Sequence, residues 1–209
     1  MPSSPKIPKE TILKAALEML IEDGYNAITI KTLSNKLGCS TQPISWHFGS
    51  MEGLRKALAE AAYKYASEKT NMVEKNIPEE FEKIGLNYID MAMDEPNLVK
   101  FIFAESGGSL YNGQLINAMS HECNRQILSG MSDAMEIDYA LTEKYMTAMV
   151  TYTHGLAMLI ASGILKDSKE ELHRRFGETG VRFMISYGVA AERADMLFKT
   201  SMKGQSSCQ

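Results

Sequence analysis

Five side chains between residues 41 and 47 have the chemical character needed to contact a nucleic acid. They are Thr41, Gln42, Ser45, Trp46 and His47. Serine and threonine hydroxyls can bind phosphates or base edges, and a glutamine amide can form two hydrogen bonds with adenine. Tryptophan can pack on a sugar or a thymine methyl, and histidine can donate to a phosphate. These side chains suit a DNA groove, provided that one surface presents all of them outward.

A short helix predicted over residues 40–47 would present them in this way. Ser40 can cap its start, and Pro43 is tolerated because first-turn N–H groups have no helical partner. Ile44 and Phe48 are four residues apart and would form the buried face, which leaves Trp46 on the opposite side. We therefore expect Trp46 to be exposed.

Two earlier helices are predicted to hold this segment in place. The first lies between Pro8 and Gly24, and the second covers residues 29–37, with Thr29 as its N-cap and Gly38 in a sharp turn after it. The apolar residues expected on their buried faces are Ile12, Ala15, Ala16, Met19, Leu20, Ile30, Leu33 and Leu37. Three helices with this spacing outline a helix-turn-helix unit. The same outline also fits a three-helix packing unit with no role in DNA binding.

The rest of the chain is also predicted to be helical, so the expected fold class is all-α. A helix from Ser50 would bury Leu54, Leu58, Ala61, Ala62 and Tyr65, and further helices are expected at 78–93, 95–105, 112–136, 139–163 and 168–199. We expect a helix-turn-helix DNA-binding domain at 8–50, a linking helix at 51–75, and a ligand-binding and dimerisation domain at 76–203. The polar tail 204–209 is expected to be disordered. Gly155, Gly180 and Gly188 interrupt the last two helices and indicate close approach of a partner or a ligand.

Composition and charge narrow the classes of protein further. The net charge is −4, but residues 1–70 contain nine Lys/Arg against seven Asp/Glu, which favours the N-terminal end for a polyanionic partner. The chain has no apolar run of about 18 residues, and its cysteines Cys39, Cys123 and Cys208 lack zinc spacing. Because no apolar stretch follows the first charged residues, we expect no secretory signal. A cytoplasmic protein without membrane contact is expected.

Motifs typical of enzymes and of metal sites are missing from the sequence. There is no glycine-rich phosphate loop, no HExxH and no nucleophile elbow. His121 and Cys123 are two residues apart and would diverge on a helix. We therefore expect no catalytic residues, no cofactor and no metal.

The stretch ILKAALEMLIEDGYNAITIKTLSNKLGCSTQPISWHF resembles the DNA-binding domain of the TetR/AcrR family of bacterial transcriptional regulators. The shared features include the Ala-Ala-Leu helix, Gly24-Tyr25, Thr29, Gly38 and His47-Phe48. Residues 94–103 and 153–163 also resemble parts of ligand-binding domains in that family. The resemblance implies a homodimer formed by the last two helices, a palindromic double-stranded DNA operator, and a repressor released by a small-molecule inducer.

Two residues depart from the family pattern. Ser45 stands where the family usually has tyrosine, and Met51 where it has lysine, and both family residues commonly contact phosphate. Lys31, Lys36 and Arg55 could compensate for the loss. The residues predicted to contact DNA are Thr29, Lys31, Lys36, Ser40, Thr41, Gln42, Pro43, Ser45, Trp46, His47 and Arg55. The alternative is a related dimer with weakened DNA binding that acts as a ligand-binding or protein-interaction module.

Methionines and aromatic residues in the C-terminal helices suit a pocket for a small apolar or amphipathic molecule, although methionine also fills cores. The residues predicted to line it are Tyr88, Met91, Phe101, Phe103, Met119, Met149, Tyr152, His154 and Met158.

Overall fold

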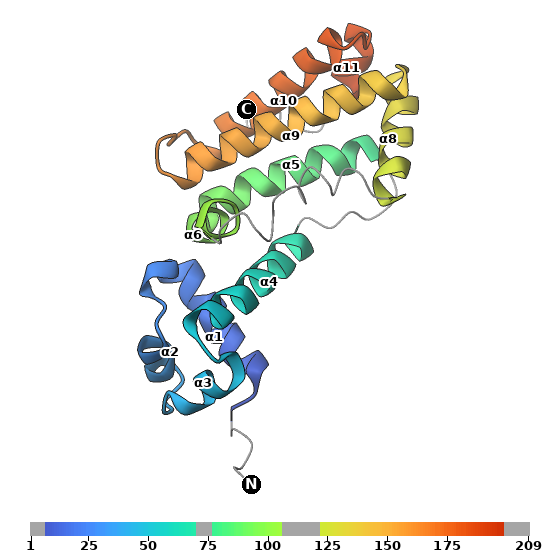
Figure 1. The fold of residues 1–209 in the computed structure, drawn as a ribbon. Helices are drawn as coiled ribbons and strands as arrows, with labels where there is room; N and C mark the ends of the chain where they lie inside the picture. The colour runs from blue at the N-terminus through green and yellow to red at the C-terminus, as the bar shows by residue number, and fades with distance from the viewer. Residues whose placement is uncertain (1–6, 70–76, 106–121, 199–209) are drawn as a thin grey trace. The chain divides into compact units, whose positions relative to one another are not determined.

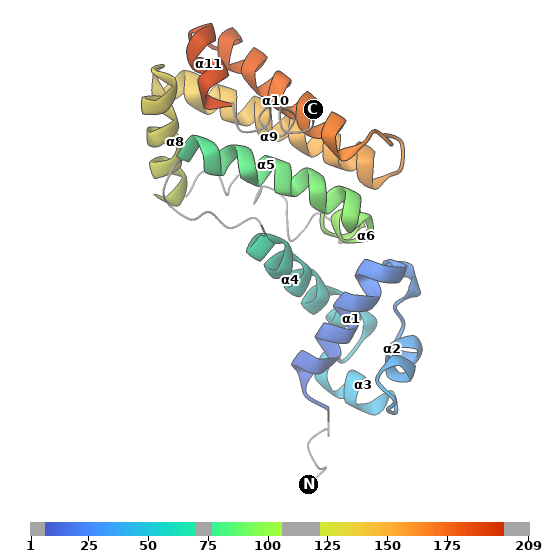
Figure 2. The ribbon, with the colours of Figure 1, turned by 180° about the vertical axis from the view of Figure 1, so that it is seen from behind.

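The structure, a computed structural model, describes residues 7–69, 77–105 and 122–198, and the regular elements within these ranges are all helical (Figures 1 and 2). They form two compact units. The first comprises residues up to Lys69 together with 94–112, and the second comprises 70–93 together with 113–209. The expected all-α fold class is confirmed. Met119 and the tail 204–209 lie outside the described residues.

The first unit contains the predicted helix-turn-helix. Its helices are α1 (Lys9–Asp23), η1 (Tyr25–Ala27), α2 (Ile30–Lys36), α3 (Gln42–Phe48), α4 (Met51–Lys69), α6 (Pro96–Lys100) and the π-helix η2 (Phe101–Glu105). Its core is apolar, and the fully buried side chains include Ile12, Leu20, Leu33, Ile44, Leu54 and Leu58. Burial of such residues from four helices fixes α3 against α1, α2 and α4.

Several side chains expected in this core are only half-buried. They are Ile30, Leu37, Phe48, Ala61 and Tyr65. Helical periodicity identifies the buried face, but residues at the edge of a narrow stripe stay in contact with solvent. The expectation for Phe48 was therefore too strong, whereas Ile44 is 0% exposed.

Residues 94–105 pack with the first unit, although the sequence placed them in the C-terminal domain. The Asn97 amide donates to the carbonyl oxygen of Ile21 on α1 at 3.2 Å, and the Phe101 ring stacks on Tyr25 at 5.0 Å between centroids. The Tyr65 hydroxyl of α4 donates to Glu95 at 2.8 Å. These long-range contacts hold α6 and η2 to α1, η1 and α4.

In its described residues, the second unit consists mainly of four longer helices. Its elements are α5 (Ile77–Asp94), α8 (Glu122–Met135), α9 (Tyr139–Ala161), α10 (Lys169–Ser186) and α11 (Ala191–Leu197). The helices α9 and α10 lie side by side in both views (Figures 1 and 2). The core between the helices includes Ile89, Met131, Tyr145, Met149 and Phe176. None of the helices within the described ranges is both long and apolar enough to cross a bilayer.

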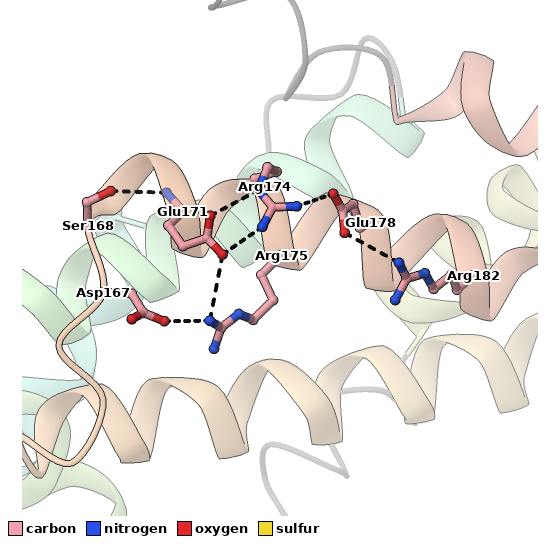
Figure 3. A network of polar contacts seen from close by, with 7 residues as sticks. All are labelled: Asp167, Ser168, Glu171, Arg174, Arg175, Glu178 and Arg182. Carbon is pink, nitrogen blue, oxygen red and sulfur yellow. Dashed lines mark hydrogen bonds and ion pairs between the residues drawn. The ribbon is translucent and has the colours of Figure 1, made fainter.

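A series of ion pairs runs along α10 (Figure 3). Arg174 lies between Glu171 and Glu178, Arg175 reaches Asp167, and Glu178 also pairs with Arg182. Hydrogen bonds from Arg174 lower the pKa of Glu171. Pairs at this spacing favour the helical conformation, although each exposed pair contributes little.

The predicted helix at 168–199 is broken into α10 and α11, so that expectation was wrong. Gly188 has a φ of 97°, and the Val189 N–H donates back to the Met184 carbonyl at 3.0 Å. This hydrogen bond belongs to a Schellman turn, in which glycine adopts the left-handed conformation at low cost. Gly188 therefore makes a turn, and a Cβ there would have no atom within 4 Å.

Gly180 does serve close packing, because a Cβ at this position would lie 2.4 Å from Cζ of Phe198. Replacing Gly180 with alanine should destabilise the second unit by about 1–3 kcal/mol through overpacking. Gly155 is a matched control, since a Cβ there meets nothing within 4 Å. In the monomeric chain, Gly155→Ala should stabilise α9 by about 0.5–1 kcal/mol. Urea unfolding measures the change in stability of both variants. Equal changes in Gly180→Ala and Gly155→Ala would contradict the close packing of Gly180 against Phe198.

Candidate nucleic-acid interface

The outward face of α3 carries the side chains that the sequence assigned to DNA contact. Trp46 is 60% exposed, whereas Ile44, two residues earlier, is 0% exposed. Exposed with Trp46 are Ser40, Thr41, Gln42 and Ser45, while Pro43 and His47 are half-buried. The predicted orientation of the helix is therefore what the structure shows. A polar surface with one large ring is exposed on a helix that a buried isoleucine holds in place.

The turn between α2 and α3 fixes the angle between the two helices. Gly38 has a φ of 63°, and its N–H donates to Asn35 at 3.1 Å. The Cys39 N–H donates to the Ser34 carbonyl at 3.0 Å. These two hydrogen bonds form a Schellman motif, which ends α2 and leads directly into α3. Thr41 occupies the N-cap position of α3 without a side-chain hydrogen bond, so the predicted cap from Ser40 is not formed.

The turn after α3 is equally tight. Gly49 has a φ of 72° and donates its N–H to Ser45 at 2.9 Å, and the Ser50 hydroxyl caps α4 by accepting from the Gly53 N–H at 3.1 Å. A Cβ on Gly53 would lie 2.0 Å from the carbonyl oxygen of Phe48. Glycine at residue 53 thus allows α4 to start directly against the end of α3.

Thr29 and His47, the two residues carried over from the family pattern, both have local partners. The Thr29 hydroxyl accepts from the Thr32 N–H at 3.0 Å, and the Thr29 N–H donates to Thr32 Oγ1 at 2.9 Å, which closes a capping box. Nε2 of His47 lies 2.9 Å from the carbonyl oxygen of Ile7. Because a carbonyl can only accept, Nε2 carries the hydrogen and Nδ1 is the ring atom left for other contacts.

Two of the three cations expected to compensate for Ser45 and Met51 are engaged within the unit. Lys36 pairs with Glu18 at 3.6 Å and with Glu22 at 3.5 Å, and the Arg55 guanidinium lies 5.2 Å from the centroid of the Tyr25 ring. Lys31 is exposed.

One further cation lies beside α3 and was not predicted from the sequence. Nζ of Lys9 lies 5.7 Å from the centroid of the Phe48 ring, which brings a positive charge from α1 to the end of α3. Lys9 and Phe48 are far apart in the chain, and only the packing of α1 on α3 brings them together.

Comparison with known proteins agrees with this geometry. Residues 12–58 match the family described as bacterial regulatory proteins, tetR family. The tetracycline repressor protein class A from transposon 1721 of Escherichia coli is 38% identical over 56 residues, which cover 27% of this chain and 26% of that relative. The match to the curated relatives thus spans about a quarter of their length. The similarity to the tetR family of bacterial regulatory proteins is thus shown for residues 12–58.

Solved structures extend the TetR likeness to the fold of most of the chain. A TetR variant from Acinetobacter baumannii, crystallised in complex with minocycline, superposes with a TM-score of 0.55 and 16% identity, covering 87% of this chain and 97% of that one. BioQ from Mycobacterium smegmatis gives a TM-score of 0.56 and 16% identity over 90% of this chain and 99% of that one. At this identity the likeness is one of fold alone.

The residues predicted to line a TetR-type ligand pocket fall into both units. Phe101 and Phe103 belong to η2 in the first unit, where Phe101 is buried against Tyr25. The other described candidates lie on two helices of the second unit, Tyr88 and Met91 on α5 and Met149, Tyr152, His154 and Met158 on α9. Met91 and Met149 are buried in the core, and Tyr152 packs edge-on against Phe183. The candidates of the second unit that meet through a hydrogen bond are Tyr88 and His154.

Tyr88 and His154 form a neutral hydrogen-bonded pair. The Tyr88 hydroxyl lies 2.8 Å from Nδ1 of His154, and the two rings are stacked. Burial raises the pKa of Tyr88 and lowers the pKa of His154. Both shifts favour the uncharged forms, so the hydroxyl donates and Nδ1 accepts.

This pair should make the second unit less stable in mild acid. The pKa of His154 is lower in the folded protein than in the unfolded chain, where it is 6.5. The unfolded state therefore binds more protons in this window, and stability is present above pH 6.5 and is lost as the pH falls through the folded pKa. Thermal melts between pH 7.5 and 5 should show this loss, and His154→Gln should reduce it. If the melting temperature of His154→Gln depended on pH as that of wild type does, His154 would not be the group responsible.

Proposed function

We propose that this chain is a DNA-binding transcriptional regulator that binds a palindromic operator as a homodimer and represses transcription. The observation that carries the proposal is the outward face of α3, where Gln42, Ser45 and Trp46 are exposed beside the buried Ile44. A helix presented in this way fits the major groove, where base edges can be distinguished. The match of residues 12–58 to the tetR family of bacterial regulatory proteins supports the same function.

The proposed response to a ligand follows from the binding of two copies of this chain to one DNA duplex. Productive binding needs the two α3 helices about 34–36 Å apart, which is one turn of B-DNA. A small molecule that prefers a different separation shifts the population away from the operator by its difference in affinity between the two states. The TetR structure in complex with minocycline supports a ligand site in this fold.

Selection of genomic DNA fragments by the purified full chain at moderate salt tests DNA binding directly. The expected result is saturable binding to fragments that share an inverted repeat, with half-site centres about 10–10.5 base pairs apart or a multiple of that distance. Enrichment of no common sequence would contradict the proposal.

A second candidate is a TetR-like dimer with weakened DNA binding that serves as a ligand-binding or protein-interaction module. It is favoured by the engagement of Lys36 with Glu18 and Glu22 and of Arg55 with Tyr25, which leaves fewer cations for phosphate. Each phosphate contact adds about 0.9 to the slope of log affinity against log salt concentration. Equal, weak affinity for selected and random duplexes would support this candidate over the first.

The proposed dimer uses α9 and α10. Exposed residues recur every fourth position along α9, at Thr147, Thr151, Gly155 and Leu159. The glycine would allow a helix of the partner to approach closely. Gly155→Phe should therefore weaken dimerisation at least tenfold while the chain stays folded, as measured by sedimentation equilibrium. Lys83→Phe, on the exposed side of α5, is the control, and unchanged association of both variants would contradict this interface.

A further inference from the structure

The sequence of α3 and of the turn before it contains none of the charged residues that recognise a G·C pair. Guanine is read through O6 and N7 by arginine or lysine, and cytosine through its N4 amino group by aspartate or glutamate. None of these four residue types occurs between residues 40 and 48. Recognition of the base pairs that α3 contacts is therefore left to neutral side chains.

Gln42 is the side chain of α3 best suited to adenine. It is exposed and is the one amide among residues 40–48, and its donor and acceptor match the N7 and the N6 amino group of adenine. Ser45 is also exposed, but a hydroxyl cannot form this pair of bonds. Nε2 of His47 lies 2.9 Å from the carbonyl oxygen of Ile7, so the protein already holds this ring.

Trp46 adds an apolar surface one helical turn after Gln42. Its side chain is 60% exposed. Side chains four residues apart on a helix have Cβ atoms about 5–6 Å apart, and successive base pairs are about 3.4 Å apart. Gln42 and Trp46 can therefore reach base pairs that are one or two steps apart. The apolar group of the major groove is the C5 methyl of thymine, on which an indole ring can pack.

We propose that α3 reads two A·T pairs, one or two steps apart, in each half-site of the operator. Gln42 bonds the N7 and N6 positions of an adenine, and Trp46 packs on the C5 methyl of a thymine. A G·C pair has no methyl group, and its guanine presents an acceptor where adenine presents the N6 donor. This inference rests on the proposed function, since it names the bases that the regulator recognises.

Selection from a randomised duplex library by the purified full chain gives the sequence of the half-site. The expected half-site contains two invariant A·T pairs that are one or two steps apart. A half-site whose invariant positions are all G·C pairs overturns the inference.

Deoxyuridine tests the contact of Trp46, because it removes only the C5 methyl of thymine and keeps base pairing. The thymines of the selected half-site are replaced one at a time. One replacement should weaken binding of wild type about three- to fivefold, the effect of one buried methyl group. The same replacement should leave the affinity of Trp46→Ala unchanged, because that variant has no ring at the methyl. Tyr63→Ala, exposed on α4, is the control and should show the wild-type loss.

7-Deazaadenine tests Gln42 in the same way, because it removes the N7 acceptor. At one adenine it should weaken binding of wild type about three- to tenfold and leave the affinity of Gln42→Ala unchanged. Each variant is also a control for the other, since Trp46→Ala should keep the loss caused by 7-deazaadenine and Gln42→Ala the loss caused by deoxyuridine. For either analogue, equal losses in wild type and in the matching variant overturn the inference.

The base analogues separate this inference from the function on which it rests. Saturable binding to a selected operator that tolerates every deoxyuridine and 7-deazaadenine replacement overturns the reading of A·T pairs and leaves DNA binding standing. Failure to select any sequence overturns both, and it is recognised before any base is replaced.

Discussion

Trp46→Ala should weaken binding to the selected operator by roughly ten- to a hundredfold without changing the stability of the fold. The side chain is 60% exposed, and its ring lies edge-on to the neighbouring His47 ring at 4.9 Å between centroids. Alanine therefore removes little packing from the protein. In the complex, a base-edge contact made by this side chain would contribute about 1–3 kcal/mol, which sets the size of the loss.

Mobility-shift titrations of wild type and variant on the same fragment measure this effect, with a random duplex of equal length for comparison. Affinity for the random duplex should change little, because phosphate contacts dominate there. Tyr63→Ala, an exposed aromatic residue on α4, is the matched control and should bind as wild type does. Equal losses on both duplexes, or a lower melting temperature for Trp46→Ala, would contradict a groove contact.

Ile44→Ala should have the largest effect on stability, about 2–5 kcal/mol for the first unit. Ile44 is 0% exposed and is the only fully buried residue of α3, so it fixes the orientation of the whole helix. A cavity at this position would loosen α3 from its neighbours. A unit of this size has little stability to lose, and DNA binding should fail as a consequence of unfolding.

Hydrogen exchange of the backbone amides measures this effect by region. Protection of the α1 to α4 amides should fall strongly in Ile44→Ala, while α9 and α10 exchange as in wild type. Ile164→Ala is the matched control, because Ile164 is 74% exposed and its truncation leaves no cavity. Unchanged protection of α1 to α4 would show that Ile44 does not hold the helix.

Local signals in the sequence were sufficient to predict the helices and turns of the helix-turn-helix. The buried face of α1, the Thr29 cap, the left-handed Gly38 and the opposite orientation of Ile44 and Trp46 are all decided within a few residues. Period and capping act over these short distances, so they can be read without knowledge of the tertiary structure. The main structural prediction for the site, that Trp46 is exposed opposite Ile44 on α3, depended on such signals.

Contacts between distant residues account for what the sequence did not reveal. Residues 94–105 contact α1, η1 and α4 through Asn97, Phe101 and Glu95, and their own sequence pattern does not indicate those partners. The position of Lys36 beside Glu18 likewise depends on helix packing. Gly188 ends α10 with a positive φ, which is a local feature of the chain. In a periodic sequence, however, a glycine that ends a helix cannot be distinguished from a glycine that allows close packing inside the helix.

Trp46 is the only tryptophan of the chain, so its fluorescence reports on α3 alone. Quenching by acrylamide should be efficient in the free protein, where the side chain is 60% exposed, and should fall severalfold when a selected operator fragment is bound. Random duplex at the same occupancy should protect the ring much less. Strong operator binding with Trp46 still fully open to acrylamide would contradict the entry of α3 into the groove.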